Sequence, residues 1–116
     1  MIGQLAIDVP ETWRNRISQA LERIVAVAQP RRVVLFGSVA RGEFGPESDL
    51  DFLVIVKGPV HRRQTAQRIY HNLHGVDAAV DVVVVTEEDV ELFGDKNGLI
   101  LRPALREGRE VYGAPE

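Results

Sequence analysis

Three short apolar runs, each the length of a single strand, constrain this chain more than any other feature of its sequence. They are RRVVLFG at residues 31–37, DLDFLVIVK at 49–57 and AAVDVVVVT at 78–86. Their β-branched residues are typical of strands, and the runs are too short to span a membrane. Segments with helical periodicity separate them, so we expect an α/β domain with a small mixed β-sheet covered by helices.

The segments between the runs place apolar residues at the three- and four-residue spacings of amphipathic helices. Pro10 suits the first position of a helix, Thr86 suits an N-cap, and Gly75 and Gly108 suit helix ends. On these grounds we expect helices over residues 11–28, 60–75, 87–93 and 99–107, a brief helical turn at 38–41, and a short last strand at 109–113.

The composition narrows the function classes. A chain of 116 residues is the size of one domain, which we expect to cover 1–116. It contains no cysteine, so disulfides and zinc–thiolate sites are excluded. We expect a cytoplasmic protein, because the N-terminal segment lacks the apolar centre of a secretory signal. The net charge of −3 argues against general nucleic-acid binding, and the basic stretch at 61–68 is more typical of a solvated helix face.

Three aspartates accompany the apolar runs. Successive residues of a strand point to opposite faces, so Asp49 and Asp51 are expected to project the same way. Asp81 lies inside the third run, where an unpaired carboxylate is costly. If the third strand pairs beside the second, Asp81 approaches the other two, and their mutual repulsion would be relieved by a cation. Mg²⁺ fits, because it is usually held by a few carboxylates together with waters and substrate phosphates.

The pair Gly37–Ser38 stands at the end of the first predicted strand. A glycine there lets the backbone approach a phosphate closely, and the serine can donate its hydroxyl and its amide to an anion. A phosphate-binding turn facing a carboxylate metal site is the combination that phosphoryl or nucleotidyl transfer requires. Each part alone is more often structural than functional.

At these residues the sequence resembles the minimal nucleotidyltransferases, small members of the DNA polymerase β-like superfamily. Their signature is Gly-Ser, ten residues, then Asp-x-Asp, and here Gly37–Ser38 is followed by residues 39–48 and then by Asp49-Leu50-Asp51. The fuller pattern GSxARGxxxxxSDxD is matched by GSVARGEFGPESDLD. Asp81 stands where the family has a third acid on a following strand.

The resemblance implies the polymerase β-like fold, ATP as the nucleotide donor, and two Mg²⁺ ions held by Asp49, Asp51 and Asp81. Gly37 and Ser38 would hold the donor phosphates. Two further motif positions are Arg41 and Ser48. Arg41 either steadies phosphate or the loop, or forms a structural salt bridge, and Ser48 either contacts the nucleotide or caps its turn.

Relatives of this size often occur beside a small helical protein of the HEPN type. In such pairs the HEPN protein is an RNase toxin, and the nucleotidyltransferase is an antitoxin that transfers AMP to a toxin tyrosine. At 116 residues, the chain is not expected to contain the helical acceptor domain of larger relatives. The acceptor surface is therefore expected on a partner chain, a second copy of this chain, or a macromolecular substrate.

Two other functions stay open. The protein could be a non-catalytic antitoxin that neutralises a HEPN partner by binding alone. It could also be an RNA-tailing or polymerase-like transferase, which the negative charge and the lack of an aromatic and basic surface stripe disfavour. The residues do not single out a general base, although Glu43 and Glu47 flank the loop.

Overall fold

The computed structural model describes residues 9–93 and 101–115. Its centre is a four-stranded sheet in the order β3-β2-β1-β4. The strands are β1 (Arg32–Phe36), β2 (Leu50–Val56), β3 (Val80–Thr86) and β4 (Arg109–Gly113). β2 and β3 are parallel, whereas β1 is antiparallel to both β2 and β4. The expected mixed sheet is confirmed, and so is its short last strand.

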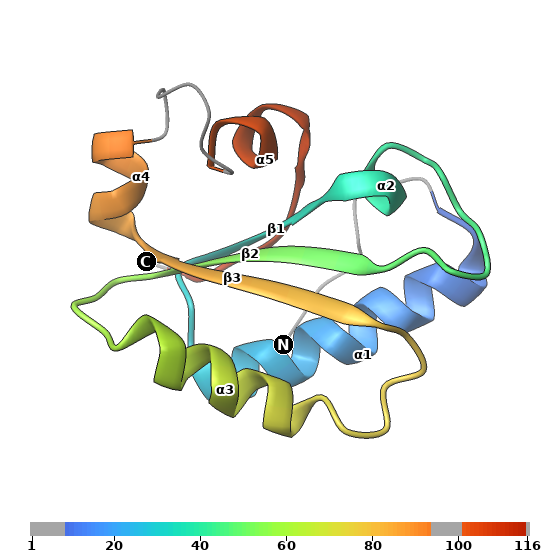
Figure 1. Cartoon of the computed structure of the whole chain (residues 1–116), viewed down its shortest axis with the longest axis horizontal. Helices are drawn as coiled ribbons and strands as arrows, with labels where there is room; N and C mark the ends of the chain where they lie inside the picture. The colour runs from blue at the N-terminus through green and yellow to red at the C-terminus, as the bar shows by residue number, and fades with distance from the viewer. Residues whose placement is uncertain (1–8, 94–100, 116) are drawn as a thin grey trace.

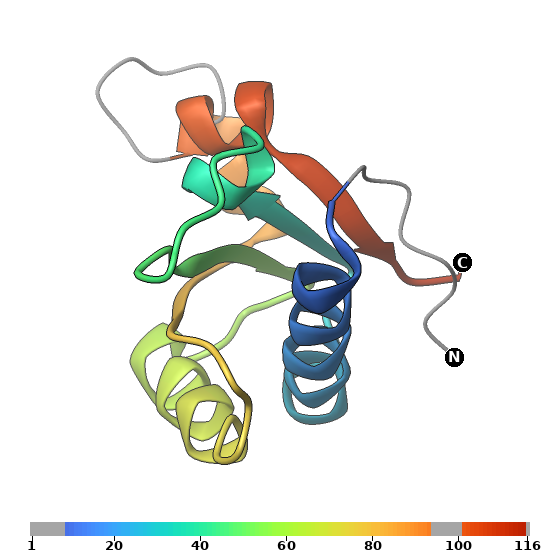
Figure 2. The same ribbon diagram turned by 90° about the vertical axis from the view of Figure 1, so that its right-hand side faces the viewer.

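Helices cover both faces of this sheet (Figure 1). Helices α1 (Glu11–Ala28) and α3 (Arg62–Asn72) lie side by side on one face, as the turned view in Figure 2 shows. Helices α4 (Glu87–Phe93) and α5 (Leu101–Glu107) lie on the other face. The brief helix α2 (Gly37–Ala40) follows β1 directly. No helix in the described ranges is both long and apolar enough to cross a membrane.

The longest helix, α1, has the bounds that its periodicity predicts. It buries Trp13, Ile17, Ala20, Leu21 and Ile24 against the sheet. Its last residue, Ala28, is followed by the C-cap Gln29, which adopts a left-handed conformation with φ 46° and donates its N–H to the carbonyl oxygen of Val25 at 3.0 Å. The next residue is proline, which lacks the N–H that a further turn would need.

Helix α3 is shorter than the expected range 60–75. It begins after His61, whose Nδ1 accepts a hydrogen bond from the N–H of Gln64 at 3.2 Å and so caps the helix. It ends at Asn72, and a turn leads to Gly75 at φ +88°. The sequence prediction was three residues too long at its end because it placed the glycine at the end of the helix rather than at the end of this turn.

Helix α4 also has its predicted bounds, and the expected N-cap is present. The N–H of Asp89 donates to Oγ1 of Thr86 at 3.0 Å, and the N–H of Thr86 donates to Oδ2 of Asp89 at 2.9 Å. This reciprocal pair satisfies N–H groups that the first turn of a helix leaves free. Residues 99 and 100 of the predicted last helix lie outside the described residues; the part that is described, α5, ends before Gly108 as expected.

Strand β3 forms one edge of the sheet, and a tyrosine of α3 covers part of that edge. The N–H of Val82 donates to the hydroxyl oxygen of Tyr70 at 2.7 Å, and this hydroxyl donates to the carbonyl oxygen of Val82 at 3.4 Å. Because an open strand edge is a template for unwanted pairing, this contact protects β3.

Candidate functional site

Two of the predicted acids stand opposite each other at the start of the parallel strands. Asp51 of β2 pairs with Asp81 of β3, and on its other side Asp51 pairs with Phe36, the last residue of β1. Paired residues of neighbouring strands project to the same face of a sheet. This is the face that α5 and α4 cover, because Leu53, Ile55 and Val85 pack there with Ala104. The register therefore brings together two residues that are 30 positions apart.

Gly37 begins α2 directly beside Asp51. Its φ of +80° lies in the left-handed region, which glycine tolerates at no steric cost. A β-carbon at this position would overlap Oδ2 of Asp51. The positive φ favours glycine at position 37, and its small size lets α2 start against the carboxylate in the orientation that Asp51 adopts.

The environment of Asp51 favours its neutral form or a bound cation. Burial raises the pKa of Asp51, and the negative charges of Asp81 and Asp49 raise it further, while Arg41 lowers it. Repulsion between carboxylates at one site is relieved when a cation binds between them. In chemical terms, this donor set fits a divalent cation with oxygen ligands.

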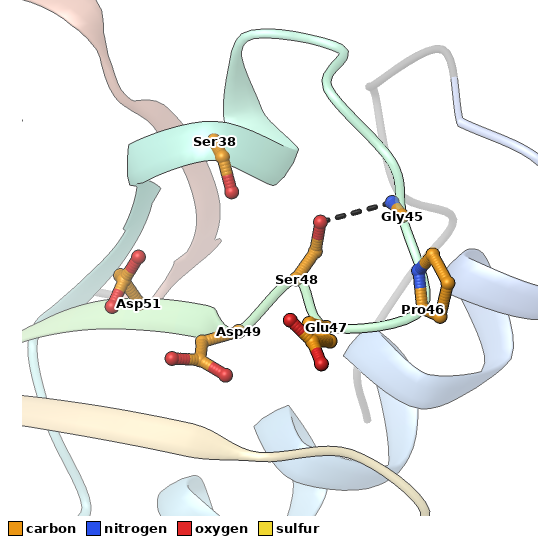
Figure 3. A pocket seen from close by; sticks show the side chains of 7 residues that line it. All are labelled: Ser38, Gly45, Pro46, Glu47, Ser48, Asp49 and Asp51. Atoms are coloured by element: carbon orange, nitrogen blue, oxygen red, sulfur yellow. Dashed lines mark hydrogen bonds between the residues drawn. The ribbon is translucent and has the colours of Figure 1, made fainter.

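Asp49 does not project as the sequence predicted. Strand β2 begins at Leu50, so the strict alternation of a strand does not extend back to residue 49. In Figure 3 the carboxylate of Asp51 points toward α2, whereas that of Asp49 points away from it. Within residues 9–93 and 101–115, no group of three or more His, Cys, Asp or Glu side chains is already placed to hold a metal ion.

A cavity of about 560 Å³ opens between α2 and the loop that precedes β2. It is lined by Ser38, Gly45, Pro46, Glu47, Ser48, Asp49 and Asp51 (Figure 3). The side chain of Ser38 points from α2 toward the loop, on the same side as the carboxylate of Asp51. Four of the residues predicted as site residues, Ser38, Ser48, Asp49 and Asp51, thus line one cavity, with one hydroxyl group on α2 and the other on the loop beside Asp49.

The loop before β2 is held by its own side chains. Oγ of Ser48 accepts the N–H of Gly45 at 2.9 Å and lies 3.3 Å from the carbonyl oxygen of Glu43, to which it donates. The ring of Phe44 lies 6.1 Å from that of Trp13 in α1. Ser48 therefore caps its turn, which is one of the two roles expected for it, while its place in the cavity wall leaves the nucleotide role as a prediction.

Arg41 lies outside the cavity wall and forms ion pairs. Its Nε donates to Oε2 of Glu43 at 2.9 Å, and its Nη1 lies 4.0 Å from Oε2 of Glu107. The hydrogen bond and the charge of Glu43 raise the pKa of Arg41 above its ordinary value. The structure thus contains the salt bridge that was one alternative for Arg41, and phosphate binding by Arg41 stays a prediction.

A second cavity of about 450 Å³ adjoins the first and shares Pro46, Glu47, Ser48 and Asp49 with it. Its far wall includes Trp13 and Arg16 of α1 and residues 76–79 before β3. Because the two cavities meet at the loop beside the acids, a substrate in one lies next to a substrate in the other.

Arg16 is a site residue that sequence reasoning missed. Its guanidinium stacks 4.8 Å above the ring of Trp13, and its Nη2 lies 3.5 Å from Oδ2 of Asp77. Its Nε is buried and has no hydrogen-bond partner among the described residues. The spacing of Trp13 and Arg16, which stacks side chains on a helix, was visible, but their meeting with Asp77 depends on the fold.

Comparisons with known proteins agree with this architecture. The model of the nucleotidyltransferase domain family matches residues 14–107. A candidate protein adenylyltransferase of Methanocaldococcus jannaschii is 34% identical over 83 residues, which are 71% of this chain and 78% of that protein. A crystal structure of a candidate nucleotidyltransferase from Sulfolobus solfataricus superposes with a TM-score of 0.57 at 20% identity, covering 93% of this chain and 92% of that one. A toxin–antitoxin crystal structure with AMP-PNP gives a TM-score of 0.54 at 20% identity, covering 82% of this chain and 72% of that one.

Proposed function

Because this chain belongs to the nucleotidyltransferase domain family, we propose that it transfers AMP from ATP to a hydroxyl group of a protein in a Mg²⁺-dependent reaction. The family makes it a nucleotidyltransferase; the donor, the metal and the acceptor are the proposal. The observation that carries the proposal is the pairing of Asp51 with Asp81 beside Gly37. It sets a carboxylate pair next to the Gly37–Ser38 turn that begins α2.

In this proposal the predicted site residues have two roles, metal binding and phosphate binding. Asp51 and Asp81, with Asp49 from the adjoining loop, would hold Mg²⁺. When bound, the metal would neutralise the triphosphate and the charge that develops on the leaving group. Gly37 and Ser38 would hold the donor phosphates, with support from Arg41 and Ser48. The resemblance implies two ions for this set.

The bond changes of the transfer are simple. The acceptor oxygen attacks the α-phosphorus of ATP, a new phosphoester bond forms, and the bond from the α-phosphorus to the bridging oxygen of the β-phosphate breaks. Pyrophosphate leaves with that electron pair, and the acceptor proton passes to a base or to water. In this scheme ATP lies in the cavity between Ser38 and Asp51, and the acceptor enters through the adjoining cavity beside Trp13 and Arg16.

We infer that the acceptor is a tyrosine of a HEPN-type RNase toxin and that the protein acts as its antitoxin in the cytoplasm. Two relationships support this inference. One relative is named as a candidate protein adenylyltransferase, and one structural neighbour is a toxin–antitoxin complex with AMP-PNP. The resemblance of the sequence to the minimal nucleotidyltransferases points to the same class of partner.

Nucleotide binding provides the first test. A ligand that binds only the folded protein raises its stability by mass action, so ATP with Mg²⁺ should raise the melting temperature, and ATP with EDTA should raise it less. The alternative function is an antitoxin that neutralises by binding alone. If the Asp49→Ala, Asp51→Ala double variant still neutralises the toxin, that alternative is favoured. If the double variant no longer neutralises the toxin, catalysis is favoured.

A further inference from the structure

A third cavity, of about 530 Å³, lies between α1 and α3 and is separate from the candidate site. It is lined by Val27, Gln64, Gln67, Arg68, His71 and Asn72. None of these residues lines either of the other two cavities described above. Figure 2 shows the two helices side by side on the face of the sheet that is opposite to α5. A ligand here would leave the nucleotide cavity open.

The walls of this cavity offer hydrogen-bond donors and no carboxylate. Arg68 can only donate, and the glutamine, histidine and asparagine side chains carry N–H groups as well as acceptors. The amide nitrogen of Asn72 already donates to the carbonyl oxygen of Arg23 at 3.0 Å, which fixes that wall. In the described part of the chain, no ion pair or hydrogen bond engages the guanidinium of Arg68.

The surrounding segment is basic, although the chain as a whole is acidic. Residues 57–76 include Lys57, Arg62, Arg63 and Arg68 and contain no aspartate or glutamate, whereas the whole chain has 17 acids against 14 lysines and arginines. Arg62 is paired, since its Nη2 lies 2.6 Å from both carboxylate oxygens of Asp89. Arg63 and Arg68 have no such partner within residues 9–93 and 101–115. The cationic charge of α3 is therefore concentrated at the cavity and beside it.

We propose that this cavity binds a carboxylate side chain in an acidic segment of a partner protein. Arg68 is the anchor, because a guanidinium presents paired donors that match a carboxylate. Gln64, Gln67 and His71 provide further N–H donors around it. The occupant is a short acidic protein segment rather than RNA. A nucleic-acid strand is held by several cations along its phosphates, whereas Arg68 is the one lysine or arginine in the lining of this cavity.

The test uses the full chain and two fluorescein-labelled peptides, one of six glutamates and one of six glutamines. Binding is measured by fluorescence anisotropy at about 0.15 M salt, where the Debye length is about 8 Å, and the binding surface is mapped from amide chemical shifts in ¹⁵N spectra. The wild type should bind the glutamate peptide, with shifts confined to residues 64–72 and the end of α1. Arg68→Glu should weaken this binding at least about tenfold, because a charge-assisted hydrogen bond is lost and replaced by repulsion.

Arg106→Glu is the matched control, because it makes the same charge change on an exposed residue of α5, on the opposite face of the sheet. It should alter binding less than about twofold, since exposed charges that lie far apart are largely screened. Equal weakening by both variants, equal binding of the two peptides, or shifts at residues 37–51 would overturn the proposal. So would tighter binding of a labelled single-stranded RNA of the same length. A normal melting temperature of Arg68→Glu would show that the loss is not caused by unfolding.

Discussion

Gly37 and Asp51 are in such close contact that a β-carbon at position 37 would overlap the carboxylate of Asp51. The glycine of the Gly-Ser pair is thus tied to the second aspartate of the Asp-x-Asp pair by packing as well as by sequence spacing. The contact exists because Phe36, the residue before the glycine, pairs with Asp51 across β1 and β2. The two parts of the motif are therefore halves of one structural unit.

Gly37→Ala should be clearly more destabilising than Gly42→Ala. Both glycines have positive φ, +80° and +83°, so both variants incur the cost of left-handed backbone, about 1–2 kcal/mol. Only position 37 adds a steric overlap, because no atom lies within 4 Å of a β-carbon at position 42. The overlapping atom is at the end of the Asp51 side chain, so the carboxylate would have to rotate away, at an added cost of about 0.5–1.5 kcal/mol for an unfavourable rotamer. Urea unfolding of both variants measures the difference, and equal losses would refute the contact between Gly37 and Asp51.

Asp51→Asn should stabilise the free protein at neutral pH while it abolishes activity. The folded state raises the pKa of Asp51, so it binds this proton more tightly than the unfolded chain does. By linkage, proton binding to Asp51 stabilises the folded state fully at pH values below the ordinary pKa of 3.8. This stabilisation is lost as the pH rises through the raised pKa of the folded state. The increase in the free energy of unfolding caused by Asp51→Asn should thus be largest near pH 7 and should become smaller toward pH 4.

Thermal unfolding across this pH range tests the prediction, with Glu22→Gln on the exposed face of α1 as a control for the loss of one negative charge. Added Mg²⁺ should stabilise the wild type more than Asp51→Asn, because a cation that binds the carboxylates stabilises the folded state. A lower melting temperature of Asp51→Asn at pH 7 would contradict the destabilisation assigned to burial of this carboxylate and to repulsion from Asp81 and Asp49.

Asp89→Ala should destabilise the protein by about 1 kcal/mol at pH 7, because it removes half of a reciprocal helix cap. Burial raises the pKa of Asp89, but the hydrogen bonds with Thr86 and the charge of Arg62 outweigh it and lower the pKa overall. The stability that the carboxylate contributes is therefore present above the ordinary pKa and is lost as the pH falls through the lowered one. Denaturant unfolding at pH 7 and in acid should show the gap between wild type and variant closing in acid; a gap that is independent of pH would argue against this cap.

Arg41→Gln should leave the free energy of unfolding almost unchanged, since its ion pairs with Glu43 and Glu107 are exposed. If Arg41 turns to the donor phosphates, the same variant should weaken ATP binding about tenfold, which calorimetric titration can measure. Arg41→Lys should recover part of this affinity because it keeps the charge. Unchanged ATP affinity in Arg41→Gln would leave Arg41 with the structural role alone.

Local sequence patterns predicted the elements of this fold well, because those patterns reflect local physics. Apolar spacing predicted α1, and Thr86 as an N-cap predicted the start of α4. Errors arose at the ends of elements, where the same residues are compatible with two positions of the boundary. Gly75 ends a turn after α3 rather than the helix itself, and β2 begins one residue after Asp49.

The candidate site could be predicted only in part, because its geometry depends on strand register. The sequence identified Asp51 and Asp81 as candidates, but their pairing requires β3 to lie beside β2 in one particular register. The turn of Asp49 away from Asp51 and the position of Arg16 near Asp77 follow from loop conformation and from contacts between distant segments. Residue spacing along the chain contains no direct signal for either.

The central claim is that the acid pair across β2 and β3 supports AMP transfer to a partner protein. ATP labelled at the α-phosphate should be incubated with Mg²⁺, the HEPN-type toxin, and the wild type, Asp51→Asn or Asp81→Asn, with thermal melts to confirm that each variant is folded. We predict Mg²⁺-dependent labelling of a toxin tyrosine by the wild type and a loss of about a hundredfold or more in each variant. Equal labelling by the variants, or no labelling of a toxin that the protein nevertheless neutralises, would contradict the claim.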